Sequence, residues 1–519
     1  MKTKKVALLL VTTMISVSMI MTGCGKTGEG GNGGNSGKSG NPPAESGGNE
    51  KPSPSETDDT NKNEKVAIEI MSDGNGTALP ENDRIKTILD EKLNIDVKLT
   101  LFGGDPANQL NLRMAAADYP DIINVTRLQM QEYARKGLLL DLTPYMDKLD
   151  QAKQFIGEDS LKKGMVDGKI YALPKRESFP FHNIWIRKDW LAKLNLEIPT
   201  TLDEFLNVAK AFTEQDPDGN GKKDTYGLTG LTINTFDPIF SAFGVGGMDT
   251  FYLKNGTLTN SFLDPAMKDA LEFIREMIKA GVVDPDLLAN SGTQHEKNAF
   301  QGKAGMIWNG FPRMTSTASV EEYKAVNQDA EWVQVPALNG PGGQYAGFWD
   351  VGSSPGLHVI PKAIEKDPVK LQRVFDLLNY VASPEGNSLV AHGEEGRHWN
   401  KENGKIVRTE LRAKEVVFMY QLLGRNEMEY LEAGYPKEAI EFSANTPRIE
   451  IYNGFLDIPE GYNPADAYRF MEEEIAKFIY GKRPISEYDD FVEKLKGTFK
   501  YQLMLDSAEK QLKDLGIVK

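Results

Sequence analysis

Short β-rich runs alternate with helical patterns at the start of the globular region, and this alternation constrains the fold more than any other feature. Residues 66–70 and 95–99 are β-rich, and residues 83–92 between them carry apolar side chains at helical spacing. A second helical pattern at 108–117 precedes a third β-rich run at 121–125. Strands separated by helices predict an α/β lobe with a mainly parallel sheet.

In such sheets, ligands bind beyond the carboxyl ends of the strands. The loops that start at Asp73, at Gly103 and at Thr126 are therefore expected to face a binding site. Thr126 and Arg127 follow the third strand directly, so we predict that both bind the ligand.

A second unit begins near Phe179 and the chain ends in helical patterns. Residues 65–519, about 455 in all, exceed one ordinary core and predict at least two lobes. A strand is expected at 184–186, and Thr201 and Glu204 have the spacing of a capping box. Helices are expected at 188–194, 202–212, 265–280, 367–382, 466–479 and 486–516.

The N-terminus has the order of an export signal. Three lysines within residues 2–5 precede an apolar stretch at 6–21, which is roughly 16 residues and short for a membrane span of about 20. Small residues then precede Cys24, the only cysteine, and this ending resembles a bacterial lipobox. It implies a lipoprotein signal peptide at 1–23 and lipid on Cys24. An ordinary signal peptide that contains a cysteine is the alternative.

Residues 24–64 predict a disordered Gly/Ser/Pro tether, because so few apolar groups cannot offset the entropy of ordering. As a random coil it would span about 35 Å. The net charge of −15 does not favour nucleic acid as a partner. It also does not favour adhesion to anionic lipid, so membrane association is expected to depend on the lipid at Cys24.

Residues 216–227 have the spacing of an EF-hand calcium loop. The predicted ligands are Asp216, Asp218, Asn220, Asp224 and the carbonyl of Lys222. The last position is Gly227 instead of glutamate, so a further ligand must come from Thr225, from water or from elsewhere. We predict structural calcium here, and an Asp/Gly-rich turn without metal is the alternative.

Enzyme motifs are weak. Residues 352–356 match GxSxG, but strand-like residues follow where a nucleophile elbow needs a helix. The histidines form no HExxH motif, and no P-loop occurs, so an ATPase would be another polypeptide. A glycoside hydrolase needs only two carboxylates, and with 75 acidic residues that alternative stays open.

Five short phrases occur in the order in which one family carries them. They are DYPDI at 118–122, DLTPY at 141–145, GKIYALP at 168–174, IRKDWL at 186–191 and FQGKAGM at 300–306. The chain therefore resembles the extracellular solute-binding lipoproteins of ABC importers, in the carbohydrate-binding family related to maltose-binding proteins.

This resemblance implies a periplasmic-binding-protein-like α/β fold, with two α/β lobes joined by a three-segment hinge and a helical C-terminal region. By analogy the crossings lie near 175–183, 296–302 and 352–360. Lobe 1 would comprise 65–178 plus 299–355, and lobe 2 would comprise 179–298 plus 356–519. Family members with a comparable Asp/Gly loop bind calcium there, away from the cleft.

The resemblance also suggests cleft residues, since sugars stack their C–H faces on flat rings and bond their hydroxyls to polar groups. The expected ligand-binding residues besides Thr126 and Arg127 are Trp308, Trp349, Asp350, Arg397, Trp399, Phe181 and Phe236. Packing in the core is the alternative for each tryptophan. The arginines at 127, 176, 187 and 397 are candidates to meet uronate carboxylates, although arginine is also a routine surface residue.

The sequence thus predicts a non-enzymatic, monomeric receptor, lipid-anchored on the outer face of the cell membrane. It would capture a carbohydrate, expected to be an oligosaccharide, and deliver it to an ABC transporter permease. A secreted carbohydrate-active hydrolase or lyase is one alternative. A lipoprotein that captures peptides or metals is another.

Overall fold

The computed structural model describes residues 65–74, 78–102, 106–176 and 178–518. The signal peptide at 1–23, the lipidation of Cys24 and the tether at 24–64 lie outside the described residues. No helix within the described ranges is long and apolar enough to cross a membrane.

The predicted parallel sheet is present at the start of the described chain. Its strands, in spatial order, are β2 (Ile95–Phe102), β1 (Val66–Asp73), β3 (Ile122–Val125), β16 (Leu357–Val359) and β6 (Ala172–Pro174). Strand β1 pairs in parallel with β2 and β3, as the strand–helix alternation predicted. Strand β16 runs antiparallel to both of its neighbours, β3 and β6.

Helices cover both faces of this sheet. Those around it are α1 (Arg84–Leu93), α2 (Pro106–Ala115), α3 (Arg127–Arg135), α4 (Asp150–Ile156), α5 (Glu158–Leu161), α13 (Pro368–Ala382) and α14 (Pro384–His392). Along β1, Ile68 and Ile70 join the core cluster of α1 and α13, whereas Met71 joins that of α2 and α3. Successive strand side chains point to opposite faces, so one strand supplies both cores. The strands β4 (Met165–Val166) and β5 (Lys169–Ile170) form a small hairpin beside them.

A second group of strands forms two further four-stranded sheets. One has the order β12 (Trp332–Gln334), β7 (His182–Arg187), β11 (Ala304–Gly310) and β8 (Tyr226–Thr229). The other has the order β10 (Thr257–Asn260), β9 (Phe251–Lys254), β19 (Ile449–Ile451) and β15 (Phe348–Asp350). The strands β13 (Leu338–Gly340) and β14 (Gly343–Tyr345) pair as a separate hairpin.

The helices of this second group are α6 (Lys188–Leu194), α7 (Leu202–Glu214), α8 (Asp237–Ala242), α9 (Ala266–Lys279), α10 (Gln294–Phe300), α11 (Phe311–Met314), α12 (Thr317–Val326), α16 (Glu427–Glu432), α17 (Lys437–Asn445), α18 (Pro464–Ile479), α19 (Tyr488–Thr498) and α20 (Tyr501–Asp514). The capping box of Thr201 and Glu204 is confirmed at the start of α7. The prediction of a single helix at 486–516 is wrong. Lys500 takes a left-handed φ of 56° and separates α19 from α20.

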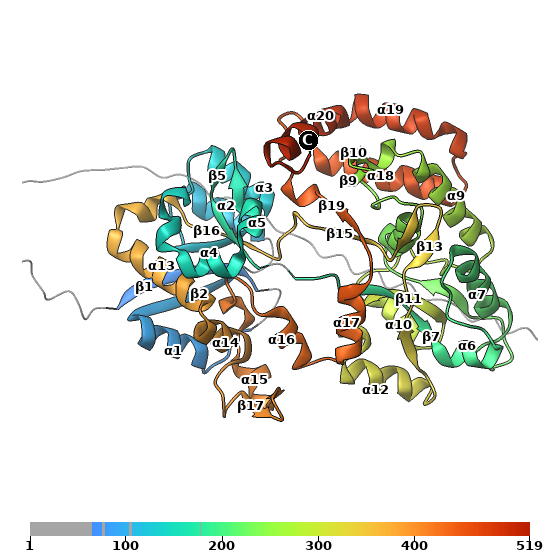
Figure 1. Cartoon of the computed structure of the whole chain (residues 1–519), viewed down its shortest axis with the longest axis horizontal. Coiled ribbons are helices and arrows are strands. Elements are labelled where there is room, and N and C mark those ends of the chain that lie inside the picture. Colours follow the sequence, from blue (N-terminus) through green and yellow to red (C-terminus); the bar gives the residue numbers. More distant parts are fainter. Residues whose placement is uncertain (1–64, 75–77, 103–105, 177, 519) are drawn as a thin grey trace, which may run out of the picture. The chain divides into compact units, whose positions relative to one another are not determined.

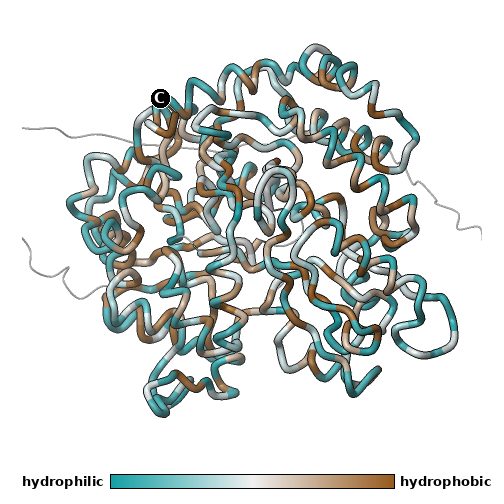
Figure 2. The backbone as a smooth tube through the Cα atoms, turned by 45° about the vertical axis from the view of Figure 1, so that its right-hand side comes forward, coloured by the Kyte–Doolittle hydropathy of each residue, from teal (hydrophilic) through white to brown (hydrophobic). Residues whose placement is uncertain are grey.

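Two lobes follow from the cores, because every hydrophobic cluster of the described residues draws on only one of the two groups. We call the group around β1 lobe 1 and the group around β7 lobe 2. Lobe 1 is the left-hand group of blue, teal and orange elements, and lobe 2 the right-hand group of green, yellow and red ones (Figure 1). Hydrophobic and hydrophilic residues alternate along the surrounding helices, as amphipathic packing requires (Figure 2).

The chain passes between the lobes at 175–181, at 351–356 and at 424–430. The first and second of these overlap the expected crossings near 175–183 and 352–360. The crossing expected at 296–302 is instead helix α10 within lobe 2, where Ala299 and Phe300 are buried.

The lobe assignment after residue 299 therefore differs from the expected one. Strand β11 pairs with β7, which places 304–350 in lobe 2 and not in lobe 1. Strand β16 pairs with β3, and the core of lobe 1 extends to Leu423. The phrase at 300–306 marks a strand correctly, but which sheet a strand joins depends on contacts distant in sequence.

Candidate functional site

Two cavities meet at the crossing segment 351–356. Ser353, Ser354 and Pro355 line both of them. We call the one of about 560 Å³, which lies mainly against lobe 1, the lobe 1 cavity. We call the one of about 620 Å³, which lies mainly against lobe 2, the lobe 2 cavity. Together they are large enough for a ligand of several sugar units.

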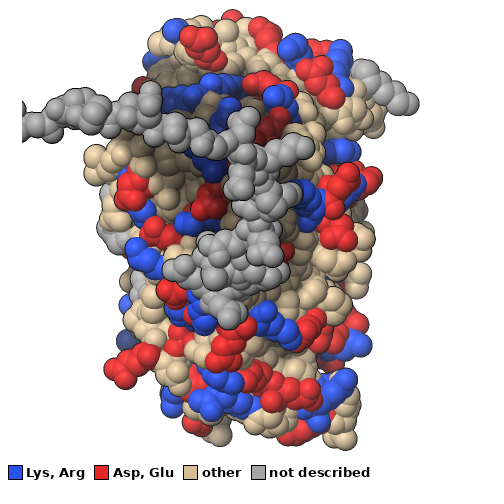
Figure 3. Space-filling view, turned by 90° about the vertical axis from the view of Figure 1, so that its left-hand side faces the viewer, with Lys and Arg blue, Asp and Glu red and all other residues tan. Residues whose placement is uncertain are grey.

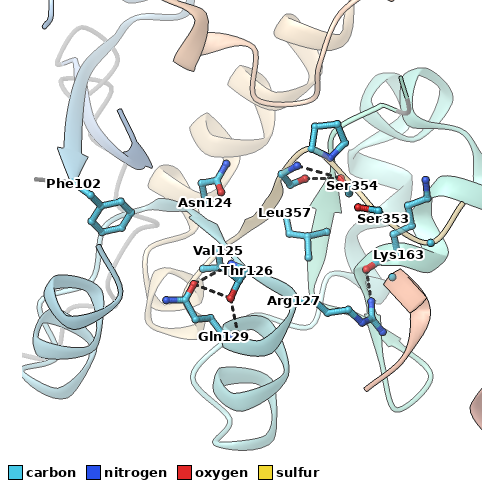
Figure 4. A pocket seen from close by; sticks show the side chains of 14 residues that line it. Phe102, Asn124, Val125, Thr126, Arg127, Gln129, Lys163, Ser353, Ser354 and Leu357 are labelled. Carbon is cyan, nitrogen blue, oxygen red and sulfur yellow. Dashed lines mark hydrogen bonds between the residues drawn. The ribbon is translucent and has the colours of Figure 1, made fainter. Parts of the chain in front are cut away.

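Thr126 and Arg127 line the lobe 1 cavity beyond the carboxyl end of β3, as the sequence predicted (Figure 4). Thr126 caps α3, since its hydroxyl accepts from the backbone N–H of Gln129 at 3.3 Å. The Gln129 side-chain oxygen accepts in return from the backbone N–H of Thr126 at 2.9 Å. This capping box fixes the wall of the cavity.

Arg127 spans the two lobes. Its guanidinium donates to the Lys163 carbonyl at 2.8 Å on the lobe 1 side. On the lobe 2 side it donates to the Phe455 carbonyl at 2.9 Å and pairs with the Asp457 carboxylate at 2.8 Å. Asp457 also accepts from Gln131 of α3 at 2.5 Å. The side chain of Arg127 is thus committed to holding the lobes together, with little capacity left for a ligand.

Three polar side chains lie near Gly356 at the edge of the lobe 1 cavity. The Asn124 amide lies 3.4 Å from Nε2 of His358, and burial holds the pKa of His358 well below its usual value. A Cβ on Gly356 would lie 2.9 Å from the Asn124 amide nitrogen and 3.2 Å from Cε of Lys175. Burial lowers the pKa of Lys175 to about 8, with a smaller effect of the Arg425 charge.

Aromatic side chains dominate the lobe 2 cavity. Its lining includes Trp308 of β11, Trp349 of β15 and Phe181 at the end of the first crossing, all three of which the sequence predicted. The ring of Trp308 lies 5.8 Å from that of His182. Gly347, with a φ of 121°, passes close over Trp308, where a Cβ would lie 3.3 Å from the ring.

Two carboxyl groups line the same cavity. The predicted Asp350 accepts the backbone N–H groups of Gly352 and Gly454, each at 2.9 Å, and burial raises its pKa. Asp237, at the start of α8, was not predicted. Burial raises its pKa well above the usual value, and no hydrogen bond or ion pair within the described ranges involves its carboxyl group.

Arg448, His182 and His295 also line the lobe 2 cavity, and sequence reasoning missed all three. The guanidinium of Arg448 donates to the carbonyls of His182, Ser443 and Thr446. Burial lowers its pKa to about 10 and also lowers the pKa of both histidines. The sequence offered only a weak signal for two of them. His182 begins strand β7 next to the first crossing, and Arg448 directly precedes strand β19. Many other residues have comparable positions.

Three predicted ligand-binding residues lie elsewhere. Phe236, in the turn η4 (Ile233–Phe236), is fully buried in the core of lobe 2. Arg397 and Trp399 belong to a part of lobe 1 made by β17 (Trp399–Glu402), β18 (Lys405–Arg408) and α15 (Glu410–Glu415). Arg397 pairs there with Glu415 at 2.8 Å, and the indole of Trp399 donates to the Gly393 carbonyl at 3.0 Å. Neither residue lines either cavity.

In the predicted calcium loop, an acidic side chain accepts hydrogen bonds from the backbone of the same loop. Asp216 accepts the N–H groups of Gly219, Asn220 and Gly221, each at 3.0 Å. The Asn220 amide donates to Asp218 at 2.7 Å and to Asp224 at 3.1 Å. Two carboxylates therefore accept from one side-chain amide, and the third, Asp216, accepts from the backbone beside them. The burial of Asp218, together with its hydrogen bond to Asp216, raises the pKa of Asp218.

The final position of this loop offers no ligand. Gly227 is in β8, and a Cβ there would lie 2.6 Å from Cβ of Ala209. Thr225 is also unsuitable, because its buried hydroxyl donates to the Phe212 carbonyl at 2.6 Å. No group of three or more His, Cys, Asp or Glu side chains in the described part of the chain has the arrangement of a metal site. The residues present nevertheless supply the oxygen type that calcium prefers.

Ser354 does not have the setting of a nucleophile elbow. Its hydroxyl lies 2.8 Å from the Gly356 carbonyl and 3.3 Å from the Lys175 carbonyl. The residues that follow form strand β16 and no helix, as the sequence indicated.

Residues 83–388, more than half of the chain, match the model of the family described as bacterial extracellular solute-binding protein. The chain belongs to this family. Two lobes with a cavity at their junction are the architecture expected of it. The periplasmic-binding-protein-like α/β fold inferred from the sequence is thereby confirmed.

Three known proteins illustrate the relationship. The polygalacturonan/rhamnogalacturonan-binding protein YtcQ of Bacillus subtilis is 25% identical over 452 residues, which cover 83% of this chain and 88% of YtcQ. The lipoprotein LipO of the same organism is 27% identical over 486 residues, covering 88% and 94%. The solved structure of the Streptococcus pneumoniae ABC-transporter substrate-binding protein FusA, an EF-hand mutant in complex with fructo-nystose, has a TM-score of 0.65 at 19% identity. It covers 86% of this chain and 98% of FusA, and at that identity it shows the fold alone.

Proposed function

We propose that this solute-binding protein captures an oligosaccharide between its lobes and delivers it to an ABC transporter permease. The observation that carries the proposal is the lobe 2 cavity, where the rings of Trp308, Trp349 and Phe181 stand beside carboxyl and guanidinium groups. Flat rings stack on the apolar faces of sugars, and the polar groups bond their hydroxyls. YtcQ and FusA, by their names, bind glycans, which supports the same ligand class.

The mechanism is a hinge. A glycan that contacts the rings of lobe 2 and the polar wall of lobe 1 binds the closed arrangement better than an open one. The closed population therefore rises with glycan occupancy, and the permease would recognise the closed form. None of these steps makes or breaks a covalent bond.

Isothermal titration calorimetry against a glycan panel, paired with a reducing-sugar assay, tests this proposal. We expect binding of at least one oligosaccharide with no release of new reducing ends. Binding of peptides with no glycan bound would contradict it.

We further propose that the protein is a monomer held at the outer face of the membrane by lipid on Cys24. The supporting observations are the lipobox-like ending before Cys24 and the similarity to LipO, which is named a lipoprotein. Mass spectrometry of the membrane fraction tests the anchor, and Cys24→Ala should release the protein to the medium. Recovery of the variant in the membrane fraction at the wild-type level would refute it.

Calcium is the proposed structural ion of the 216–224 loop. Asp216, Asp218, Asn220 and Asp224 would hold it through side-chain oxygens, together with the Lys222 carbonyl, and the ion would neutralise the gathered carboxylates. FusA has been studied as an EF-hand mutant, which supports a loop of this kind in this fold. The site lies in lobe 2 between α7 and β8, and its side chains line neither cavity.

One observation favours a second candidate, a glycoside hydrolase. Asp237 and Asp350 line one cavity, and both have raised pKa values, as a general acid requires. Against this, two backbone N–H groups already bond Asp350. Release of reducing ends that Asp237→Asn abolishes would favour the hydrolase over the receptor.

A further inference from the structure

The surface and the cavities of this protein differ in charge. The chain has a net charge of −15, and Figure 3 shows acidic and basic side chains interspersed on the face that it presents. The lobe 1 cavity, by contrast, is lined by Arg127 and Lys163 and by no acidic residue among its described lining. A cavity without acidic groups in an acidic protein points to a ligand that carries negative charge.

Two cations at the junction lack a carboxylate partner. Lys175, at the first crossing, forms no ion pair within the described ranges, and the charge that lowers its pKa besides burial is that of Arg425, which is not an acid. Arg448, on lobe 2, donates only to backbone carbonyls. A half-buried ammonium or guanidinium is more costly to keep without an anion than an exposed one, so both groups are poised to pair with an anion that enters.

The carboxyl groups of the lobe 2 cavity do not pair with these cations within the described ranges. Asp350 instead accepts the backbone N–H groups of Gly352 and Gly454, each at 2.9 Å. Arg127 is not available to pair with a ligand, because its guanidinium already forms an ion pair with Asp457.

We propose that the captured glycan is an acidic oligosaccharide whose carboxylates pair with Lys175, which lies behind the cavity-lining Gly356 at the lobe 1 side, and with Arg448, which lines the lobe 2 cavity. This inference rests on the proposed glycan-receptor function and specifies its ligand class. One uronate unit would then lie on each side of the 351–356 crossing. A ligand whose carboxylates pair with both cations therefore contacts both lobes. The guanidinium of Arg448 can meet a carboxylate only with the N–H groups that its three carbonyl partners leave available, whereas Lys175 acts as a point charge.

The test uses uronate trimers (galacturonate, glucuronate and mannuronate) and their carboxyl-reduced counterparts, which carry a neutral hydroxymethyl group in place of each carboxylate. We expect the mature protein to bind at least one uronate trimer tenfold or more tightly than its reduced form. Raising NaCl from 50 to 500 mM should weaken the acidic ligand and leave the reduced one unchanged. Lys175→Met and Arg448→Met should each lose about tenfold for the uronate trimer and less than twofold for the reduced form.

Arg397→Met is the matched control, because it removes a cation of lobe 1 that pairs with Glu415 beside β17 and α15 and not with groups at the junction. Lys175→Arg and Arg448→Lys keep the charge and should retain most of the affinity, which separates loss of charge from loss of folding. Tighter binding of the reduced trimer, or equal losses in the Arg397 control, would overturn the acidic-ligand inference and leave the glycan receptor standing. Binding of no glycan of either kind would defeat the receptor proposal as well.

Discussion

The two cavity walls use different chemistry, although they meet at the same three residues. The lobe 2 wall presents rings from β11 and β15, with Asp237 and Asp350 between them. The lobe 1 wall presents capped backbone, amides and cations around Thr126 and Asn124. Rings supply affinity for any sugar, whereas charges discriminate among sugars. The comparison predicts that loss of a ring of lobe 2 lowers affinity for every glycan, whereas loss of a cation at the junction changes the preference between acidic and neutral glycans.

The largest effect on glycan affinity should come from Trp308→Ala. Loss of a stacking ring at the centre of a binding site costs more than about 2 kcal/mol, which is about 30-fold in Kd. The loss should be equal for acidic and neutral glycans, because stacking does not depend on charge. Titration calorimetry measures both, and Trp399→Ala, outside the cavities, is the control. If the Trp308 variant and the wild type bound glycan with equal affinity, the glycan would not bind against the rings of lobe 2.

The contact between the lobes should show the next effect, on stability. Arg127 and Asp457 form a largely buried pair, so Arg127→Met leaves a carboxylate with only Gln131 and the more exposed Arg135. A double-mutant cycle with Asp457→Asn, read by urea unfolding, should give a coupling energy of about 2 kcal/mol. A coupling near zero would mean that Arg127 does not join the lobes and is available to a ligand.

A smaller effect is expected from pH. The pKa of Lys175 is lowered to about 8, so its cation is present below pH 8 and is lost as the pH rises toward 10. The affinity for a uronate trimer should therefore fall about tenfold between pH 7 and pH 9, because only the cation pairs with a carboxylate.

His358, near Lys175, does not confuse this readout, because burial holds its pKa well below the window. Arg448, whose pKa is lowered to about 10, keeps most of its charge up to pH 9. Lys175→Arg should keep its affinity to pH 9, and the carboxyl-reduced trimer should show no such fall in the wild type. An identical decline for the charged and the reduced trimer would assign the pH effect to another group.

Calcium should have the smallest effect on binding. Removal of the ion with EDTA should lower the melting temperature by several degrees, since bound ligand stabilises the folded state. Glycan affinity should change less than twofold, because the 216–224 loop lines neither cavity. Asp218→Asn should abolish the response to EDTA. A wild-type melting curve that is indifferent to EDTA would count against the metal.

Much of the local structure followed from the sequence. Strand–helix alternation predicted the sheet of lobe 1 up to β3, and the capping residue Thr201 predicted the start of α7. Thr126, Trp308 and Trp349 could be proposed as ligand-binding residues because each stands at the end of a strand or beside a crossing, and all three line a cavity. These features depend on neighbours within a few residues, which a single sequence displays directly.

Sequence reasoning did not predict the site residues that come from segments far apart in the chain. Asp237 and Arg448 reach one cavity from positions more than 200 residues apart, and Phe236, adjacent to Asp237, points into the core. A single ring cannot be assigned to a cleft or to a core from its type, because both sites bury the same apolar surface.

The sequence by itself determined an α/β protein with the solute-binding phrases, a lipobox-like leader and an Asp/Gly loop. Only the tertiary structure decided that β11 belongs with β7, that β16 belongs with β3, and that the chain crosses for the third time at 424–430. The physical reason is that propensity and capping act along the chain, whereas strand partners and desolvated charges are set by packing between segments hundreds of residues apart.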